Sequence, residues 1–314
     1  MNIEEFEAAR AHPSWLAGRA LAIVTMVFAA GAAMPASAAT LDRIRETGSI
    51  KLGYLADARP FSYKNEAGAA DGYSVTLCKR IASEVKSQLG LSQLAVEWVP
   101  VTMDSRLSGI QQGSVDLLCT PSNITLSRRQ QAAFSLPVFA GGNRAVLRAD
   151  SAAALRQALA ETPSTKPVWR GSPAAKVLKD TRFAVVSGST SETWLKSRAA
   201  KLQVKAKIVP VENYRAGLQQ LRDGKVDVLF GERALVLGVV SDPARENLEV
   251  LDRQFTSEQA ALALARGDDD FRQVVDSALS KAYASADFRD LYTKYFGSFD
   301  DGTRAFFRMN TLAE

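Results

Sequence analysis

Two periods of hydrophobicity run along this chain of 314 residues. Short apolar runs that stop at Gly, Pro, Ser or Asn predict buried strands. Segments in which apolar residues return every three or four positions predict amphipathic helices. The clearest helix spans residues 73–89 and places Val75, Ile81 and Val85 on one apolar face. Strands and helices therefore alternate along the chain, which is typical of an α/β protein.

The second half of the chain repeats the plan of the first. Residues 107–118 and 218–229 match in letters, since each has a helix that stops at a glycine (Gly113, Gly224) and a strand that opens with Val-Asp. The flanking elements match too. We expect strands at 50–55, 95–100, 117–119, 183–186, 207–210 and 226–230, and helices at 41–48, 73–89, 106–112, 192–200 and 214–222. This pattern predicts two similar lobes, each a mostly parallel sheet flanked by helices.

Two crossings are expected to join the lobes as a hinge. Residues 145–148 would leave the first lobe, and residues 259–265 read as a returning strand. The expected division is a first lobe at 39–145, a second lobe at 146–256, and a return to the first lobe with C-terminal helices at 257–314. The proline-containing stretch 157–179 is expected to be a surface insertion.

The first 38 residues are expected to be a cleaved signal peptide. Arg19 precedes an apolar run at 20–34, and the small residues at 35–39 match an A-x-A cleavage site. The run is short for a membrane span, which needs about 20 residues. We therefore expect an exported protein of the periplasm, an oxidising compartment.

Composition excludes several classes of function. The formal net charge of +5 is spread along the chain and forms no basic stripe with interleaved aromatic residues, so a nucleic-acid partner is not expected. The single histidine, His12, lies in the expected leader. The mature chain would then lack histidine-based triads, general bases and metal ligands, and we expect no metal or other cofactor. Cys78 and Cys119 could form a disulfide or remain as two buried thiols.

Candidate binding residues cluster after the predicted strand at 117–119. The chain turns at 120–123, and Thr125 can cap a short helix with Arg128 in its first turn. A guanidinium beside free amides and small hydroxyls is suited to clamp a carboxylate through two parallel hydrogen bonds. The alternative is a surface arginine paired in sequence with Arg129.

Polar groups also follow the carboxyl ends of the corresponding predicted strands in the second half of the chain. After strand 183–186, Ser189 and Glu192 have the spacing of a capping box, at a helix N-terminus that could bind a carboxylate or simply be capped. After strand 226–230 comes Glu232, which is either a binding carboxylate or a solvated side chain. Ligands of open parallel sheets bind at these carboxyl ends.

Three segments give the chain a family resemblance: Gly72-Tyr73-Ser74-Val75, Cys119 to Phe134, and Val186 to Glu192. They resemble the periplasmic amino-acid-binding proteins of ABC importers, the family 3 solute-binding proteins, and especially the glutamate/aspartate-binding branch. The resemblance covers nearly all of the expected mature chain. It implies a type II two-lobed fold, joined by a two-strand hinge, that closes on its ligand.

The resemblance also implies roles for individual residues. Arg128 would hold the ligand α-carboxylate, helped by Thr190 from the second lobe. The carbonyl of Pro121 and the side chain of Asn123 would help receive the α-ammonium, with Glu232 as counter-ion. Ser189, beside Thr190, is expected to belong to the same ligand site.

Three departures from the family pattern concern the expected site. Glu232 stands where the family usually has Asp, and Tyr214 replaces a histidine. Leu55 stands where the branch has an arginine for the side-chain carboxylate, and Arg59 is near enough in sequence to substitute. Phe61, in the aromatic-rich stretch that follows Arg59, is also expected to line the site.

The expected function is capture of an L-amino acid, with polar or acidic ones favoured, and its delivery by a monomer to an inner-membrane ABC permease with its ATPase. The alternative is a periplasmic enzyme on the same fold, similar to cyclohexadienyl dehydratases, that uses Glu232 as an acid. A third alternative is a partner of a membrane sensor. The set Arg128, Thr190 and Glu232 matches the two charged ends of an amino acid and offers no nucleophile beside a base, which favours binding.

Overall fold

A computed structural model describes residues 40–160, 172–240 and 247–313 of the chain. These residues form two five-stranded sheets flanked by helices and one small three-stranded sheet. The expected signal peptide, residues 1–38, lies outside the described residues, as does the centre of the expected insertion. The parts of that insertion that are described belong to the end of α5 (Ala153–Ala160) and to α6 (Pro173–Asp180).

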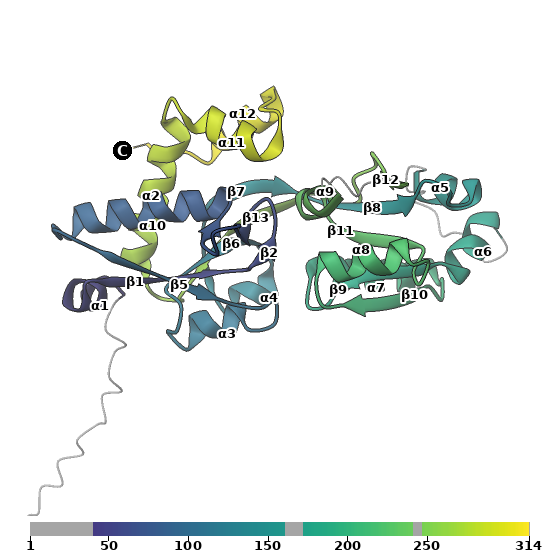
Figure 1. Cartoon of the computed structure of the whole chain (residues 1–314), viewed down its shortest axis with the longest axis horizontal. Helices are drawn as coiled ribbons and strands as arrows, with labels where there is room; N and C mark the ends of the chain where they lie inside the picture. Colours follow the sequence, from purple (N-terminus) through teal and green to yellow (C-terminus); the bar gives the residue numbers. More distant parts are fainter. Residues whose placement is uncertain (1–39, 161–171, 241–246, 314) are drawn as a thin grey trace, which may run out of the picture. The chain divides into compact units, whose positions relative to one another are not determined.

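The first sheet has the strand order β5-β1-β6-β13-β7. Its strands are β1 (Ser49–Tyr54), β5 (Ala95–Pro100), β6 (Leu117–Asn123), β7 (Ala133–Gly141) and β13 (Glu258–Leu264). The first three are parallel, and β13 runs antiparallel between β6 and β7. Helices α2 (Tyr73–Gln88) and α10 (Asp269–Ala284) lie side by side and cover one face of this sheet (Figure 1). We call this sheet and its helices the first lobe.

The second sheet has the order β10-β9-β11-β8-β12. Its strands are β8 (Asn143–Arg148), β9 (Arg182–Val186), β10 (Lys207–Val211), β11 (Val228–Glu232) and β12 (Leu248–Val250). Helices α7 (Thr190–Leu202), α8 (Tyr214–Arg222) and α9 (Arg233–Val240) pack against it. This is the second lobe.

The two-lobed α/β fold expected from the sequence is confirmed, with a difference in strand direction. Each sheet is mixed, because β13 in the first and β8 in the second run antiparallel to their neighbours. Residues 145–148, expected to leave the first lobe, belong to β8 and pair with β11 and β12 in the second sheet.

Strand β6 is longer than the sequence predicts. The turn expected at 120–123 is absent from this described segment, because the returning strand β13 pairs with Ser122 and Asn123 and keeps them extended. Pro121 lies at the register shift of this pairing, where no partner residue needs its missing N–H. The irregularity therefore lets a proline lie inside the strand without breaking the ladder.

The two crossings between the lobes touch at Gly142. A side chain at this position would run into the Thr256 carbonyl, so only glycine allows the close approach. Asn143 then donates its backbone N–H to the Thr256 hydroxyl (2.9 Å), and its carbonyl accepts from the Phe255 N–H (2.8 Å). The two connecting strands are thus held together where the chain changes sheets.

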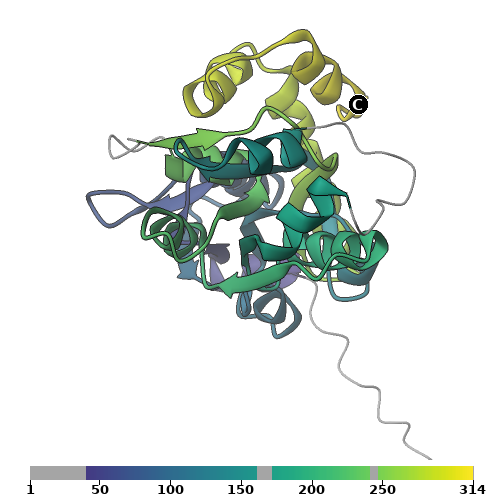
Figure 2. The same cartoon turned by 90° about the vertical axis from the view of Figure 1, so that its right-hand side faces the viewer.

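The remaining elements extend the first lobe. They are α1 (Thr40–Thr47), β2 (Asp57–Ala58), β3 (Ser62–Lys64), β4 (Ala70–Asp71), α3 (Arg106–Gln111), α4 (Leu126–Arg129), α11 (Phe288–Phe296) and α12 (Asp301–Met309). Helices α10, α11 and α12 stay together in both views (Figures 1 and 2). Aromatic side chains, including Phe288, Tyr292 and Phe307, pack edge to face between them.

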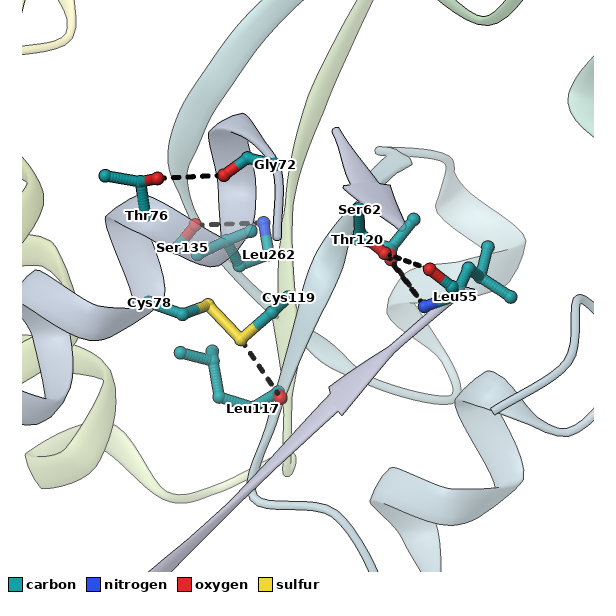
Figure 3. Close-up of a disulfide and its surroundings, with 10 residues drawn as sticks. All are labelled: Leu55, Ser62, Gly72, Thr76, Cys78, Leu117, Cys119, Thr120, Ser135 and Leu262. Atoms are coloured by element: carbon teal, nitrogen blue, oxygen red, sulfur yellow. Dashed lines mark hydrogen bonds between the residues drawn. A yellow bond between two sulfur atoms is a disulfide. The ribbon is translucent and has the colours of Figure 1, made fainter. Parts of the chain in front are cut away.

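Cys78 on α2 and Cys119 on β6 form a disulfide that is fully buried in the core of the first lobe (Figure 3). Beside it, the hydroxyls of Ser62 and Thr120 lie 2.7 Å apart, and both accept from the Leu55 N–H. The disulfide fixes α2 against β6, and the hydroxyl pair fixes the tips of β1 and β6. The disulfide and the hydroxyl pair thus stabilise the edge of the sheet where the candidate site lies.

Candidate functional site

One cavity is lined by residues of both lobes, at the carboxyl ends of the parallel strands. It contains eight of the nine ligand-binding residues expected from the sequence. The first lobe contributes Phe61, Pro121, Asn123 and Arg128, and the second contributes Ser189, Thr190, Tyr214 and Glu232.

Arg128 reaches across this cavity. Thr125 caps α4 as expected, with its hydroxyl accepting from the Arg128 N–H (3.1 Å). The guanidinium donates to the carbonyl of Asn123 (3.0 Å) and to that of Gly188 in the second lobe (3.3 Å). Burial lowers the pKa of Arg128, and the Glu258 carboxylate opposes that shift. Arg129, by contrast, is exposed, so the two neighbouring arginines differ in environment.

Asn123 and Thr190 meet directly across the two lobes. The Asn123 amide donates to the Thr190 hydroxyl (2.7 Å), which donates in turn to Glu258 (3.1 Å). The same amide also donates to Glu258, a residue that sequence reasoning missed. The carbonyl oxygen of the Asn123 side chain has no partner among the described residues, so it remains available as an acceptor.

Glu232 is the last residue of β11 and is only 7% exposed, so the solvated alternative is wrong. Its carboxylate accepts from the N–H groups of Gly142 (3.4 Å), Ala234 (2.8 Å) and Leu235 (3.2 Å), the last two in the first turn of α9. Burial raises its pKa from the ordinary 4.5 to about 7, although these donors favour the ionised form.

Tyr214 begins α8 and lies against Glu232. Its hydroxyl accepts from the Glu232 N–H (3.2 Å), and burial raises its pKa well above the ordinary value. Gly231 makes this contact possible, since a side chain there would overlap the tyrosine ring. The phenol and the carboxyl of these two residues therefore form one wall of the cavity.

Ser189 caps α7, but the expected capping box is altered. The Ser189 hydroxyl accepts from the Glu192 N–H (3.1 Å), whereas the Glu192 carboxylate accepts from Gly188 and not from Ser189. Ser189 also donates to the Val186 carbonyl (2.6 Å), so its hydroxyl is committed to the fold. The N–H groups of Thr190 and Ser191, in the first turn of α7, lack an intrahelical acceptor and remain suited to an anion.

The structure places Arg59 outside this cavity. Its guanidinium stacks over the ring of Tyr63, 3.6 Å from the ring centroid, and lines a different cavity. The Arg59–Pro60 peptide bond is cis. Phe61, two residues on, does reach the site and packs its ring on Phe139 at 4.9 Å between centroids.

Arg106 is the main site residue that sequence reasoning missed. It begins α3, lines the cavity and is 5% exposed. Its guanidinium makes no hydrogen bond or salt bridge within the described part of the chain. Burial and the nearby charge of Arg128 lower its pKa to about 10. Its position could have been predicted, because Arg106 follows β5, whose carboxyl end lies at the same sheet edge as those of β1 and β6.

Small polar groups complete the cavity. The Ser122 hydroxyl is buried and has no hydrogen-bond partner in the structure as described. Asp57 on β2 also lines the cavity, and burial raises its pKa. No group of three metal-ligating side chains occurs among the described residues. The arrangement can bind a small molecule that carries both anionic and cationic groups.

A two-lobed α/β fold with a cavity between its sheets, lined by apolar walls and a few charged side chains, is typical of solute-binding proteins. Residues 50–298 match the sequence model of the bacterial extracellular solute-binding proteins, family 3, and the chain belongs to this family. Within the described ranges, none of the helices has the length and apolar character needed to cross a membrane.

Individual relatives agree with this assignment. The L-glutamate/L-aspartate-binding protein of Pseudomonas aeruginosa is 28% identical over 277 residues, which are 88% of this chain and 85% of that protein. The cyclohexadienyl dehydratase of the same organism is 25% identical over 84% of this chain and 88% of the enzyme. Among solved structures, an ancestral amino acid-binding protein, a precursor of cyclohexadienyl dehydratase, matches with a TM-score of 0.66 and 26% identity over 82% of this chain and all of its own.

Proposed function

We propose that this protein binds an acidic L-amino acid, glutamate or aspartate, between its lobes. The observation that carries the proposal is Arg106, a buried guanidinium beside Arg128 that has no hydrogen-bonding partner among the described side chains. An isolated buried charge is costly, and a second like charge in the same cavity adds to the cost. A ligand with two carboxylates removes both penalties.

The charges of the cavity fit such a ligand. Among the described residues, Arg106 and Arg128 are the two cations that line the cavity, and Asp57 and Glu232 are its two carboxyl groups. We assign Arg106, Arg128 and Glu232 to the ligand. A zwitterion with an additional carboxylate has the complementary set of two negative groups and one positive group. A neutral amino acid would leave the buried Arg106 guanidinium without a hydrogen-bonding partner among the described residues.

The proposed roles follow from position. Arg128, with Thr190 and the N-terminus of α7, holds the α-carboxylate from both lobes. The second carboxylate lies against Arg106, with the free Ser122 hydroxyl as an additional donor. Glu232 and the Asn123 side-chain oxygen receive the ammonium.

The remaining groups of the cavity complete this arrangement. The Pro121 carbonyl is a further acceptor for the ammonium, while Phe61 and Tyr214 form walls and Ser189 acts through its cap.

The protein would deliver its ligand to an ABC permease and its ATPase in the inner membrane. Family membership supports this, as does the relative that is named as an L-glutamate/L-aspartate-binding protein. Export would use residues 1–38 as a cleaved signal peptide, and the mature protein would act as a monomer in the periplasm. The lobe division expected at 39–145, 146–256 and 257–314 is part of this proposal, with its first boundary moved to Gly142, where the chain passes from β7 to β8.

A thermal-shift screen of the twenty amino acids tests the function. A ligand that binds only the folded state raises the melting temperature by an amount that grows with the ratio of its concentration to its Kd. We expect glutamate and aspartate to give the largest shifts. A response confined to apolar amino acids, or to sugars or metal ions, would contradict the proposal.

One observation favours a second candidate. Glu232 is a buried acid whose pKa of about 7 suits proton transfer at neutral pH, and one relative is a cyclohexadienyl dehydratase. Incubation with prephenate or arogenate, followed by detection of product, tests this. Turnover that disappears in Glu232→Gln would establish the enzyme, and its absence at high protein concentration would reject it.

A further inference from the structure

A second cavity, of about 560 Å³, lies beside the first. One side is α9 of the second lobe, and the other is formed by α11, the turn after it and the stretch Arg59–Tyr63 of the first lobe. The two sides touch, because a side chain at Gly238 on α9 would run into the Arg59 carbonyl. Its volume is in the range of small-molecule sites.

The lining of this cavity is aromatic and cationic. Arg59 stacks over Tyr63, and the Lys294 ammonium lies 5.1 Å from the centroid of the Tyr295 ring. Arg233 enters from α9, and its Nε is buried with no hydrogen-bond partner among the described residues. Three cations thus face a single carboxylate, Asp300, among the described residues that line the cavity.

The two cavities share a wall. Phe139 lines both, and the consecutive residues Glu232 and Arg233 face opposite sides, Glu232 the first cavity and Arg233 the second. The Glu232 carboxylate also accepts from the first turn of α9, so the helix that carries Arg233 is fixed to the first site. A molecule in the second cavity would contact both lobes and lie one side chain away from the amino-acid ligand.

We propose that the second cavity is an effector site for a small organic anion with an aromatic body, such as an arylcarboxylate. Its carboxylate pairs with Arg233 and satisfies the unpartnered Nε. Its ring lies among the tyrosines and the stacked Arg59 guanidinium. Because the occupant bridges the lobes, it stabilises the closed arrangement and tightens amino-acid binding. The coupling rests on the proposed function, whereas the binding itself does not.

Calorimetric titration of the whole mature protein with phenylacetate tests the site. We expect saturable binding at one site, with phenylacetamide, the neutral molecule of the same shape, at least tenfold weaker. Arg233→Gln should weaken phenylacetate binding at least tenfold, and Lys294→Gln, at an exposed position, severalfold. Arg289→Gln, on the same helix as Lys294 but outside the cavity, is the matched control and should bind like the parent.

Three results would overturn the site, and the first two concern the phenylacetate titrations. One is absence of saturable binding to the parent, and the other is equal binding by the parent and both cavity variants. Displacement of phenylacetate by saturating glutamate would place it in the first cavity and also overturn the proposal. Coupling is measured separately, as the Kd of glutamate with and without saturating phenylacetate. We expect the Kd of glutamate to fall at least threefold when phenylacetate is bound. The Kd of phenylacetate should fall by the same factor when glutamate is bound.

If saturating phenylacetate leaves the Kd of glutamate unchanged, the proposed stabilisation of the closed lobes is wrong. If glutamate does not bind at all, the proposed function fails, while the phenylacetate titrations of the four proteins still decide the second site.

Discussion

Arg106 and Arg128 face the same cavity, and burial, helped by the nearby charge of Arg128, lowers the pKa of Arg106 to about 10. Arg128 is held by carbonyls from both lobes, whereas Arg106 has no such partner within the described residues. Arg106 is buried and Arg128 is half-buried, and two like charges in one cavity destabilise the empty protein. The pair therefore favours a ligand that brings two carboxylates.

Replacement of Arg128 by lysine should weaken ligand binding by about 2 kcal/mol, or roughly thirtyfold, because lysine keeps the charge but loses the planar fork. Calorimetry with glutamate measures the loss. Arg129→Lys is the matched control, since Arg129 is exposed and adjacent. Equal affinities for the two variants would show that Arg128 does not hold a ligand carboxylate.

Thr190→Val should cost about 1 kcal/mol of binding free energy, or roughly fivefold in Kd. The change removes the hydroxyl that accepts from Asn123 and donates to Glu258, but leaves the backbone amides of α7 in place. Small-angle scattering with and without ligand should show incomplete closure at ligand concentrations that close the parent. Full closure with unchanged affinity would contradict the role of Thr190 in joining the lobes.

Glu232 should make folding stability fall as pH rises. Its folded-state pKa of about 7 exceeds the ordinary 4.5, so the folded protein keeps a proton that the unfolded chain loses. The contribution, on the order of 3 kcal/mol, is present below about pH 4.5 and lost by about pH 7. Urea unfolding at pH 5 and pH 8 should show this loss in the parent and not in Glu232→Gln. Identical pH dependence in both would refute it.

The disulfide between Cys78 and Cys119 closes a loop of 41 residues. In the chain-entropy model such a loop contributes about 4 kcal/mol by restricting the unfolded state. The double variant Cys78→Ala/Cys119→Ala should lose stability of this order in urea unfolding, while its affinity for ligand changes little. A stability equal to that of the oxidised parent would contradict the prediction. Titration of the denatured, unreduced parent should find no free thiol.

Local patterns predicted most of the fold because each element carries its own signal. The apolar face of α2 and the helix cap at Thr125 can be recognised from the sequence alone. Strand β6 was misjudged at Pro121 to Asn123, since its extension depends on pairing with β13, about 140 residues later. The direction of β8 likewise depends on a partner far along the chain.

The residues expected at strand ends do line one cavity, and other lining residues were not predicted. Arg128, Thr190 and Glu232 follow strands and reach the cavity as expected. Arg59 was expected there from sequence proximity alone, but it stacks on Tyr63 and faces the second cavity. Arg106 could have been predicted in the same way, because it follows the carboxyl end of β5. Glu258 could not be found locally, because its contacts with Asn123 and Thr190 exist only once both lobes are assembled.

The most direct test of the account is calorimetry of the parent and Arg106→Gln with L-glutamate and L-glutamine. These ligands differ by one carboxylate, which the account pairs with Arg106. The parent should bind glutamate at least thirtyfold more tightly than glutamine, a difference of about 2 kcal/mol, and the variant should lose most of this preference. Equal affinity of the parent for both ligands, or an unchanged preference in Arg106→Gln, would contradict the account.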